Sequence, residues 1–277
     1  YSACAVRSRM CIISLWLTRV KQCPIRRGRG FKHPRGGWLH MELTYYGHSA
    51  LAITAADTSL VIDPFFGHPD VTGDPTADLS PEYVLATHGH VDHIGAMDAF
   101  TDATLVAVPE LIGYLEETYG FSESIPMNIG GTVRCGGLFV TMVRADHTNS
   151  ADSDHTRSLG TPVGFCIGTE APHLEATGDF PTVYHAGDTG LMSEMRDVIG
   201  AYLRPTIAAL PVGDHFTMGP KQAAVAAEWL DVETVIPIHH GTFPTIEVDL
   251  EAAAATITDH SGAAVELLGV GEQLTIR

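Results

Sequence analysis

Cysteine is scarce in this chain, which argues against a fold that depends on disulfides or on thiolate-bound zinc. Five cysteines occur among 277 residues, and no two of them have the CxxC spacing of a thiolate metal site. Three lie within residues 1–40, and the other two, Cys135 and Cys166, stand in apolar segments. We expect these two to be buried small hydrophobic residues in a reducing cytoplasm.

Positive charge is almost missing after residue 40. Nine of the sixteen Lys and Arg residues precede residue 41, which leaves seven against all 33 acidic residues and a formal net charge of −26. A single lysine, Lys221, is among the seven. Such a surface stays hydrated where salt screens its self-repulsion, with a Debye length of about 3 Å at 1 M, so we predict a halophilic source. The same charge repels phosphate backbones and argues against a nucleic-acid partner.

Residues 1–40 differ from the rest of the chain and contain no acidic residue. The segment begins with Tyr, and its apolar residues 10–17 resemble the hydrophobic part of a short signal peptide. Basic residues follow at once, no small-residue cleavage site is present, and the run is too short to span a bilayer. We predict a disordered lead or an upstream-extended start rather than a targeting segment. A single domain over residues 41–277 and no membrane partner are expected.

The most informative motif is HxHxDH, which follows an apolar run and occupies residues 88–93. Imidazole nitrogen and carboxylate oxygen are ligands that Zn²⁺ and its neighbours prefer, whereas a packed core would have to pair each of them. Side chains alternate along an extended loop, so His88 and His90 point to one side and can reach one ion. Asp92 and His93 follow where the chain turns into a helix, displaced enough to serve a second ion about 3.5–4 Å from the first.

Further candidate ligands each follow an apolar run that is expected to be a strand. They are His147, Asp188 and His239. A strand followed by His or Asp, repeated in this way, is what a metal site at one edge of a sheet requires.

The ordered series of motifs resembles the metallo-β-lactamase superfamily: HxHxDH, a later lone His, Gly-Asp-Thr-Gly at 187–190 and Pro-x-His at 237–239. Four further stretches resemble its small metal-dependent hydrolases related to ascorbate-6-phosphate lactonases, at residues 46–49, 62–64, 216–220 and 237–244. The resemblance implies a four-layer αββα sandwich of the α/β (α+β) class, where periodicity alone indicates only mixed α and β structure. It covers nearly the whole chain except its start.

The expected elements agree with that layout. Apolar strands are expected at 43–46, 50–54 and 59–62. Helices are expected at 94–100, 109–118, 190–200 and 220–230, the last with Pro near its first turn.

The resemblance also implies a ligand set. One metal would be held by His88, His90 and His147, and the second by Asp92, His93 and His239, with Asp188 bridging the two. Asp63 matches an aspartate that supports the histidine loop by hydrogen bonding. The cofactors are expected to be two divalent ions, zinc first, although manganese and iron accept the same ligands.

The remaining histidines have weaker assignments. His155, in the polar stretch after His147, is an alternative ligand. His48 matches a histidine near the substrate and is a candidate to protonate the leaving group; His215 is a second candidate or an ordinary loop residue. His185 is expected to support the site or to pack, and His240 replaces an expected aromatic residue. Three others are expected to be solvated: His68, His173 and His260.

Metal-assisted hydrolysis is the function that the resemblance implies. A bridging hydroxide would attack a carbonyl or phosphoryl centre of a small metabolite, with Asp92 both binding metal and orienting the nucleophile. An ester or lactone is favoured. A phosphodiesterase of the RNA-processing type and a non-catalytic metal-binding module are the alternatives, and the resemblance makes a homo-oligomer plausible.

Overall fold

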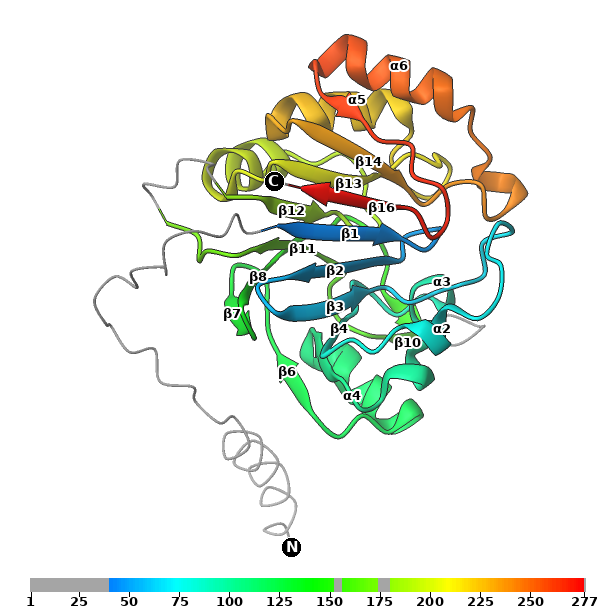
Figure 1. Ribbon diagram of the computed structural model, residues 1–277, viewed down its shortest axis with the longest axis vertical. Helices are drawn as coiled ribbons and strands as arrows, with labels where there is room; N and C mark the ends of the chain where they lie inside the picture. Colours follow the sequence, from blue (N-terminus) through cyan, green and yellow to red (C-terminus); the bar gives the residue numbers. More distant parts are fainter. Residues whose placement is uncertain (1–39, 152–155, 174–179, 277) are drawn as a thin grey trace, which may run out of the picture. The chain divides into compact units, whose positions relative to one another are not determined.

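Two seven-stranded β-sheets form the centre of the fold in the computed structural model, which describes residues 40–151, 156–173 and 180–276 (Figure 1). In spatial order the first sheet contains β16 (Gln273–Ile276), β1 (Met41–Tyr45), β2 (Leu51–Ala55), β3 (Thr58–Ile62), β4 (Tyr83–Leu85), β5 (Thr104–Ala107) and β6 (Ser124–Pro126). The second contains β15 (Ala264–Val265), β14 (Thr234–Ile238), β13 (Ile207–Pro211), β12 (Thr182–His185), β11 (Val163–Gly168), β8 (Leu138–Arg144) and β7 (Thr132–Cys135). A small ribbon pairs β9 (Ser150–Ala151) with β10 (Arg157–Ser158). The described residues belong to one compact unit.

Helices flank both sheets. The first sheet carries α4 (Pro109–Tyr119), which contacts β5 and β6. The second carries α5 (Pro220–Leu230) and α6 (Leu250–Ser261), which pack on each other and contact β13 and β15 (Figure 1). This order of helix, sheet, sheet and helix confirms the four-layer αββα sandwich. The shorter helices are α2 (Pro75–Asp78), α3 (Val91–Ile94), η1 (Met97–Phe100), η2 (Met195–Leu203) and η3 (Pro244–Ile246).

The side chains of β11 alternate between two hydrophobic cores, one on each face of the second sheet. Phe165 and Ile167 are fully buried in the core that also contains residues of the first sheet. Cys166, between them, belongs to the core beneath the helices of the second sheet. Successive side chains of a strand point to opposite faces, and burying each apolar one contributes about 1.5–3 kcal/mol. Cys135 and Cys166 are both buried, as expected.

The strand directions decide where loops gather. Each sheet contains three antiparallel strand pairs and three parallel pairs. The parallel pairs connect neighbouring strands from β3 through β4 and β5 to β6 in the first sheet, and from β12 through β13 and β14 to β15 in the second. Parallel strands have their carboxyl ends at the same edge of the sheet. The loops that leave β3 and β4 therefore lie at one edge of the first sheet, and those that leave β12 and β14 lie at one edge of the second. Polar residues follow each of these strands.

Two expected helices differ from those in the structure. The helix expected over 94–100 is split into α3 and η1, because Ala96 N donates a hydrogen bond to Pro64 O (2.9 Å) instead of continuing the helix. The helix expected over 190–200 begins only at Met195, as the π-helical segment η2, since Gly190 N is bonded to Asp146 O (3.1 Å). Among the described residues, no helix has the length and apolar character that crossing a membrane requires.

Candidate metal centre

The candidate ligands lie beyond the carboxyl ends of strands from both sheets. Asp63 follows β3, His88 and His90 lie between β4 and α3, Asp92 and His93 lie in α3, and Asp188 follows β12. Positive φ angles occur at His48 (53°), Asp63 (48°) and His239 (55°). Such left-handed backbone costs a residue other than glycine about 1–3 kcal/mol, and it persists where the surrounding structure holds it. Three residues at or beside the candidate ligands therefore have strained backbone that the fold holds in place.

One group of possible ligands contains His88, His90 and His147, whose nitrogen atoms all lie within 4.8 Å of one another. His88 Nε2 and His90 Nδ1 are 3.0 Å apart, as expected for two side chains directed to the same side of an extended loop. His147 comes from the loop that follows β8 in the other sheet. The structure thus brings together the three histidines that the resemblance assigned to one metal.

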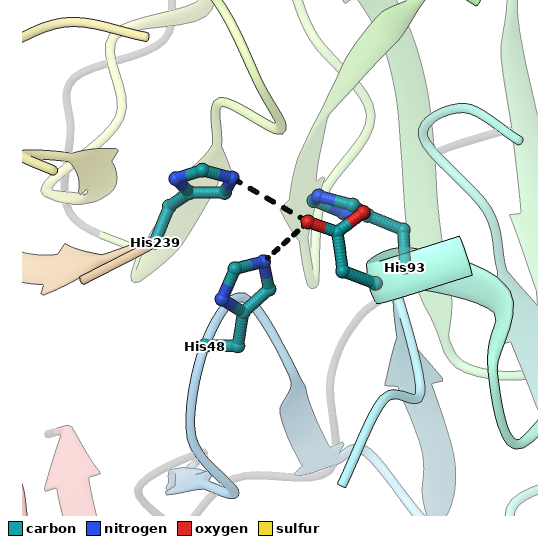
Figure 2. A group of neighbouring side chains, drawn as sticks. His48, His93 and His239 are labelled. Carbon is teal, nitrogen blue, oxygen red and sulfur yellow. Dashed lines mark ion pairs between the residues drawn. The ribbon is translucent and has the colours of Figure 1, made fainter. Parts of the chain in front are cut away.

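A second group contains Asp92, His93, His239 and, in addition, His48. Figure 2 shows His48 and His239 directed toward one carboxylate. The Nε2 atoms of these two histidines lie 3.2 and 4.0 Å from Asp92 Oδ2. His48 lies in the turn between β1 and β2, and this turn is held beside the loop after β14 because His239 N donates a 2.7 Å hydrogen bond to His48 O. His48 therefore lies among the possible ligands, which its position in the sequence did not indicate.

Asp188 lies between the two groups. Its Oδ2 is 3.5 Å from His147 Nε2 and 2.9 Å from His239 Nε2, and its Oδ1 is 3.3 Å from His93 Nε2. The side chain is only 2% exposed, so these contacts are made away from solvent. The carboxylate consequently faces nitrogen ligands from both groups.

Asp63 holds the histidine loop in place by hydrogen bonds. Its Oδ1 accepts a hydrogen bond from Thr87 N (2.8 Å), and its Oδ2 accepts from Thr87 Oγ1 (2.6 Å) and from His93 Nδ1 (2.8 Å). Asp63 also lies within 4.8 Å of His88 and His93 as a possible ligand, but both of its oxygens are already used. We therefore interpret Asp63 as a support that leaves His93 Nε2 free to face the site.

Two residues that hold the histidine loop by hydrogen bonding were not predicted from the sequence. Thr87 Oγ1 lies 3.0 Å from His88 Nδ1, and Asn149 Oδ1 accepts a 2.8 Å hydrogen bond from Gly89 N. The polar character of Asn149 was visible in the sequence, but its partner lies 60 residues away. Only the fold reveals such pairs.

Burial and neighbouring charges decide the protonation of the cluster. Burial, followed by the nearby His93, lowers the pKa of His88 well below its ordinary value, and burial and His147 lower the pKa of His90 to about 4. For Asp188, burial raises the pKa, but the charges of His93 and His239 outweigh it and lower the pKa well below the ordinary value. Neutral imidazole and ionised carboxylate are the forms that bind metal ions.

Several buried polar atoms fit a bound cation. His48 Nε2, His93 Nε2 and Asp188 Oδ1 are buried, and none of them has a hydrogen bond of good geometry within the described part of the chain. A buried polar atom without a partner costs about 1–3 kcal/mol, so a cluster of them in one place requires an explanation. Nitrogen and carboxylate donors without thiolate suit zinc, manganese or iron. The residues present therefore fit divalent metal ions.

Comparison with known proteins agrees with this geometry. A family model for the β-lactamase superfamily domain matches residues 42–239. The chain belongs to this superfamily. A UPF0173 metal-dependent hydrolase of Haloquadratum walsbyi is 57% identical over 210 residues, which cover 76% of this chain and 89% of the relative. A second, from Azorhizobium caulinodans, is 39% identical over 236 residues, which cover 81% and 96%.

A solved structure supports the same assignment. The metallo hydrolase Igni18 from the archaeon Ignicoccus hospitalis superimposes with a TM-score of 0.73 at 32% identity, covering 86% of this chain and 99% of that one. At the level of class, this member of the β-lactamase superfamily is a metal-dependent hydrolase with the metallo-β-lactamase fold.

Histidines outside the ligand groups of this hydrolase differ in their surroundings. His185 is buried; its Nε2 donates to Ser49 O (2.8 Å) and its Nδ1 accepts from Gly187 N (3.2 Å), so it ties the loop of His48 to the loop of Asp188. His215 is exposed, belongs to neither group and contacts the ring of Phe216 edge-on.

The expectation that His68 is solvated is wrong. Its side chain is only 9% exposed, because Gly47 and Gly241 allow the backbone to close over it. His240 packs at a ring distance of 6.4 Å, and burial lowers the pKa of His240 to about 4. His173 and His260 are exposed, as expected, and His155 lies outside the described residues.

Proposed function

We propose that this hydrolase cleaves an ester or lactone bond of a small metabolite with two divalent metal ions. The observation that carries the proposal is the position of Asp188, whose Oδ2 lies 3.5 Å from His147 Nε2 and 2.9 Å from His239 Nε2. A carboxylate that faces two separate groups of nitrogen ligands is what a two-metal site requires.

Different side chains would hold the two ions. His88, His90 and His147 would hold one; Asp92, His93 and His239 would hold the other; and Asp188 would contact both. Zinc is the first choice for this donor set, and manganese and iron accept the same ligands. Two such ions supply activation of water at neutral pH and polarisation of the scissile carbonyl.

Asp92 is the residue best placed to orient the attacking water. Burial raises its pKa, but the contact with His48 and the charge of His93 outweigh this effect, so the pKa falls below its ordinary value and the carboxylate is ionised at neutral pH. The side chain is 21% exposed, whereas His48 beside it is completely buried. Asp92 can therefore contact both the ligand cluster and a water molecule that enters from outside.

His48 is better suited to orient Asp92 than to protonate a leaving group. Burial is the main reason that the pKa of His48 is lowered to about 4, so its ring is neutral at pH 7. A neutral imidazole is a weak proton donor, since catalysis by an acid is most efficient when its pKa lies near the working pH. His215, which is exposed, stays our candidate to donate a proton to the leaving group.

We propose a small molecule, and not a nucleic acid, as the substrate. Residues 41–277 have a formal net charge of −26, and several of their few cations are already paired with acids. These pairs are Arg144 with Asp146 (2.8 Å), Arg157 with Glu117 (3.0 Å) and Arg196 with Asp197 (2.8 Å). Phosphate backbones bind to clusters of free cations, which supports a small substrate.

The test measures metal content and turnover on protein purified in high salt. We expect about two metal ions per chain, as in two-metal hydrolases. In a panel of esters, lactones, thioesters and phosphodiesters, we expect turnover of esters or lactones that chelation abolishes. Asp188→Asn should lose both bound metal and turnover. His260→Ala should keep both, because His260 only pairs with Glu228 on the surface (3.2 Å).

Other results would overturn parts of the proposal. Full metal content and turnover in Asp188→Asn would refute the two-metal site. Turnover confined to phosphodiesters would refute the ester or lactone assignment while leaving the metal site intact.

A further inference from the structure

Apolar side chains are exposed around the candidate metal centre. Within the described part of the chain, six large hydrophobic residues are exposed, and three of them lie on segments that carry or adjoin candidate ligands: Val91 (74%), Phe216 (57%) and Phe243 (40%). Phe65, which is half-buried, lies next to Phe243 with a ring distance of 6.4 Å. We call these four residues the apolar rim. Clusters of exposed apolar residues mark binding sites, whereas single ones are ordinary.

Phe65 and Phe243 lie beside the second ligand group. The ring of His48 is 5.5 Å from the Phe65 ring and 5.8 Å from the Phe243 ring. Room for Phe65 depends on Gly95, because a Cβ at that position would lie 2.9 Å from the Phe65 ring. The two aromatic rings are thus held close to Asp92 and His239, which His48 contacts.

Val91 stands between two candidate ligands. It is the first residue of α3, with His90 before it and Asp92 after it. Since both neighbours are directed to the ligand groups, Val91 is left exposed at the same place. An exposed valine contributes little to folding, so its apolar side chain has no structural explanation at this position.

Phe216 is held in place by a loop that adjoins the site on two sides. Asp214 and His215 both have left-handed backbone, with φ of 57° and 52°. Met218 N donates a 3.0 Å hydrogen bond to Thr189 O, next to Asp188. On the other side, a Cβ on Gly213 would collide with the carbonyl of His239. The strained loop is therefore fixed against segments that carry two candidate ligands, and it leaves Phe216 exposed.

We propose that the apolar rim binds an alkyl or aryl group of the substrate next to the bond that is cleaved. The inference rests on the proposed function and narrows it to esters or lactones with an apolar substituent near the reacting carbonyl. The four side chains of the apolar rim carry no charge, which suits an uncharged group at this place. An aromatic side chain offers about 150–250 Å² for such contacts.

A series of nitrophenyl esters tests the proposal on the metal-loaded full chain in high salt. Acetate, butanoate and hexanoate esters share one leaving group and differ only in the length of the acyl chain. We expect kcat/KM to rise roughly two- to fourfold per methylene, which corresponds to at most about 0.8 kcal/mol for each buried CH₂. Phe216→Ala and Phe243→Ala should each reduce this slope.

A matched control uses an exposed apolar residue outside the ligand loops. Val198 lies on η2 and is 45% exposed, so Val198→Ala should keep the wild-type slope. Phe216 is 57% exposed, which keeps Phe216→Ala informative if Phe243→Ala fails to fold. A wild-type slope near zero, or equal slopes in wild type and in both rim variants, would overturn the apolar rim and leave the hydrolase assignment standing.

A binding experiment separates failure of the rim from failure of the proposed function. If the metal-loaded protein hydrolyses none of these esters and no ester or lactone of the wider panel, the proposed function fails, and the rim is tested by calorimetry with hexanoate and acetate. Tighter binding of hexanoate, lost in Phe216→Ala, would still support the apolar rim. Equal affinity for the two carboxylates would overturn it.

Discussion

Replacing Asp63 by asparagine tests how the ligand histidines are held. Asp63 is completely buried, and its two oxygens accept three hydrogen bonds from Thr87 and His93. Asparagine keeps the shape of the side chain but replaces one oxygen by an NH₂ donor. In one orientation this donor faces Thr87 N, which can only donate. In the other it faces His93 Nδ1 and forces the proton of that ring to Nε2, the atom directed at the site.

The magnitude follows from these contacts. Removing a partner from a buried hydrogen-bonded group costs about 1–3 kcal/mol, and more when the group is charged. We therefore expect Asp63→Asn to lower the free energy of unfolding by about 2–4 kcal/mol. A residue that orients a metal-binding histidine typically contributes about 10–100-fold to metal affinity, and we expect a loss in that range.

Two measurements on the same samples check this reasoning. Unfolding by denaturant in high salt gives the change in stability, and competition with a chelator gives the zinc affinity. Asp102→Asn is the control, because Asp102 is exposed and such surface changes stay within about 0.5 kcal/mol. An Asp63→Asn protein with wild-type stability and wild-type zinc affinity would refute the role assigned to Asp63.

Three further predictions concern hydrogen bonding, pH and salt. Thr242→Val removes the hydroxyl that lies 2.8 Å from His48 Nδ1, and we expect it to lower the free energy of unfolding by about 1–3 kcal/mol in denaturant unfolding. Thr242→Ser keeps a hydroxyl and should retain most of the stability, so equal losses in the two variants would contradict this prediction. Zinc affinity should fall from pH 8 to pH 6. Although burial lowers the pKa of His93, Asp188 and Asp63 raise it well above its ordinary value, so a bound metal must displace a proton from this ring. A Kd for zinc that stays constant over this pH range would contradict the prediction. Thermal stability should rise from 0.1 to 2 M KCl as salt screens a formal net charge of −26, and a flat or falling Tm would contradict a halophilic surface.

Local spacing explains why much of the candidate site was predictable. His88 and His90 are two residues apart in an extended loop, and the structure places their ring nitrogens 3.0 Å apart. His147, Asp188 and His239 were predicted because each follows an apolar strand, and the ends of such strands do meet. Both features depend on neighbours in the chain and on the period of a strand, which a sequence displays directly.

Contacts between distant segments were not predictable in the same way. His48 joins the second ligand group only because the turn between β1 and β2 meets the loop after β14, where His239 N bonds His48 O. The hydroxyl of Thr242 lies 194 residues from His48, and the support of Gly89 by Asn149 spans 60. The burial of His68 likewise depends on Gly47 and Gly241 from different loops.

The sequence by itself determined the mixed α and β composition, the ordered ligand motifs and the excess of acidic residues, because each is a property of residue type and short-range spacing. The tertiary structure alone decided the place of Asp188 between two ligand groups, the burial of His48 beside Asp92 and the collection of apolar residues around the site. Each of these depends on which loops the two sheets bring to a common edge, and that is a consequence of packing over long distances in the chain.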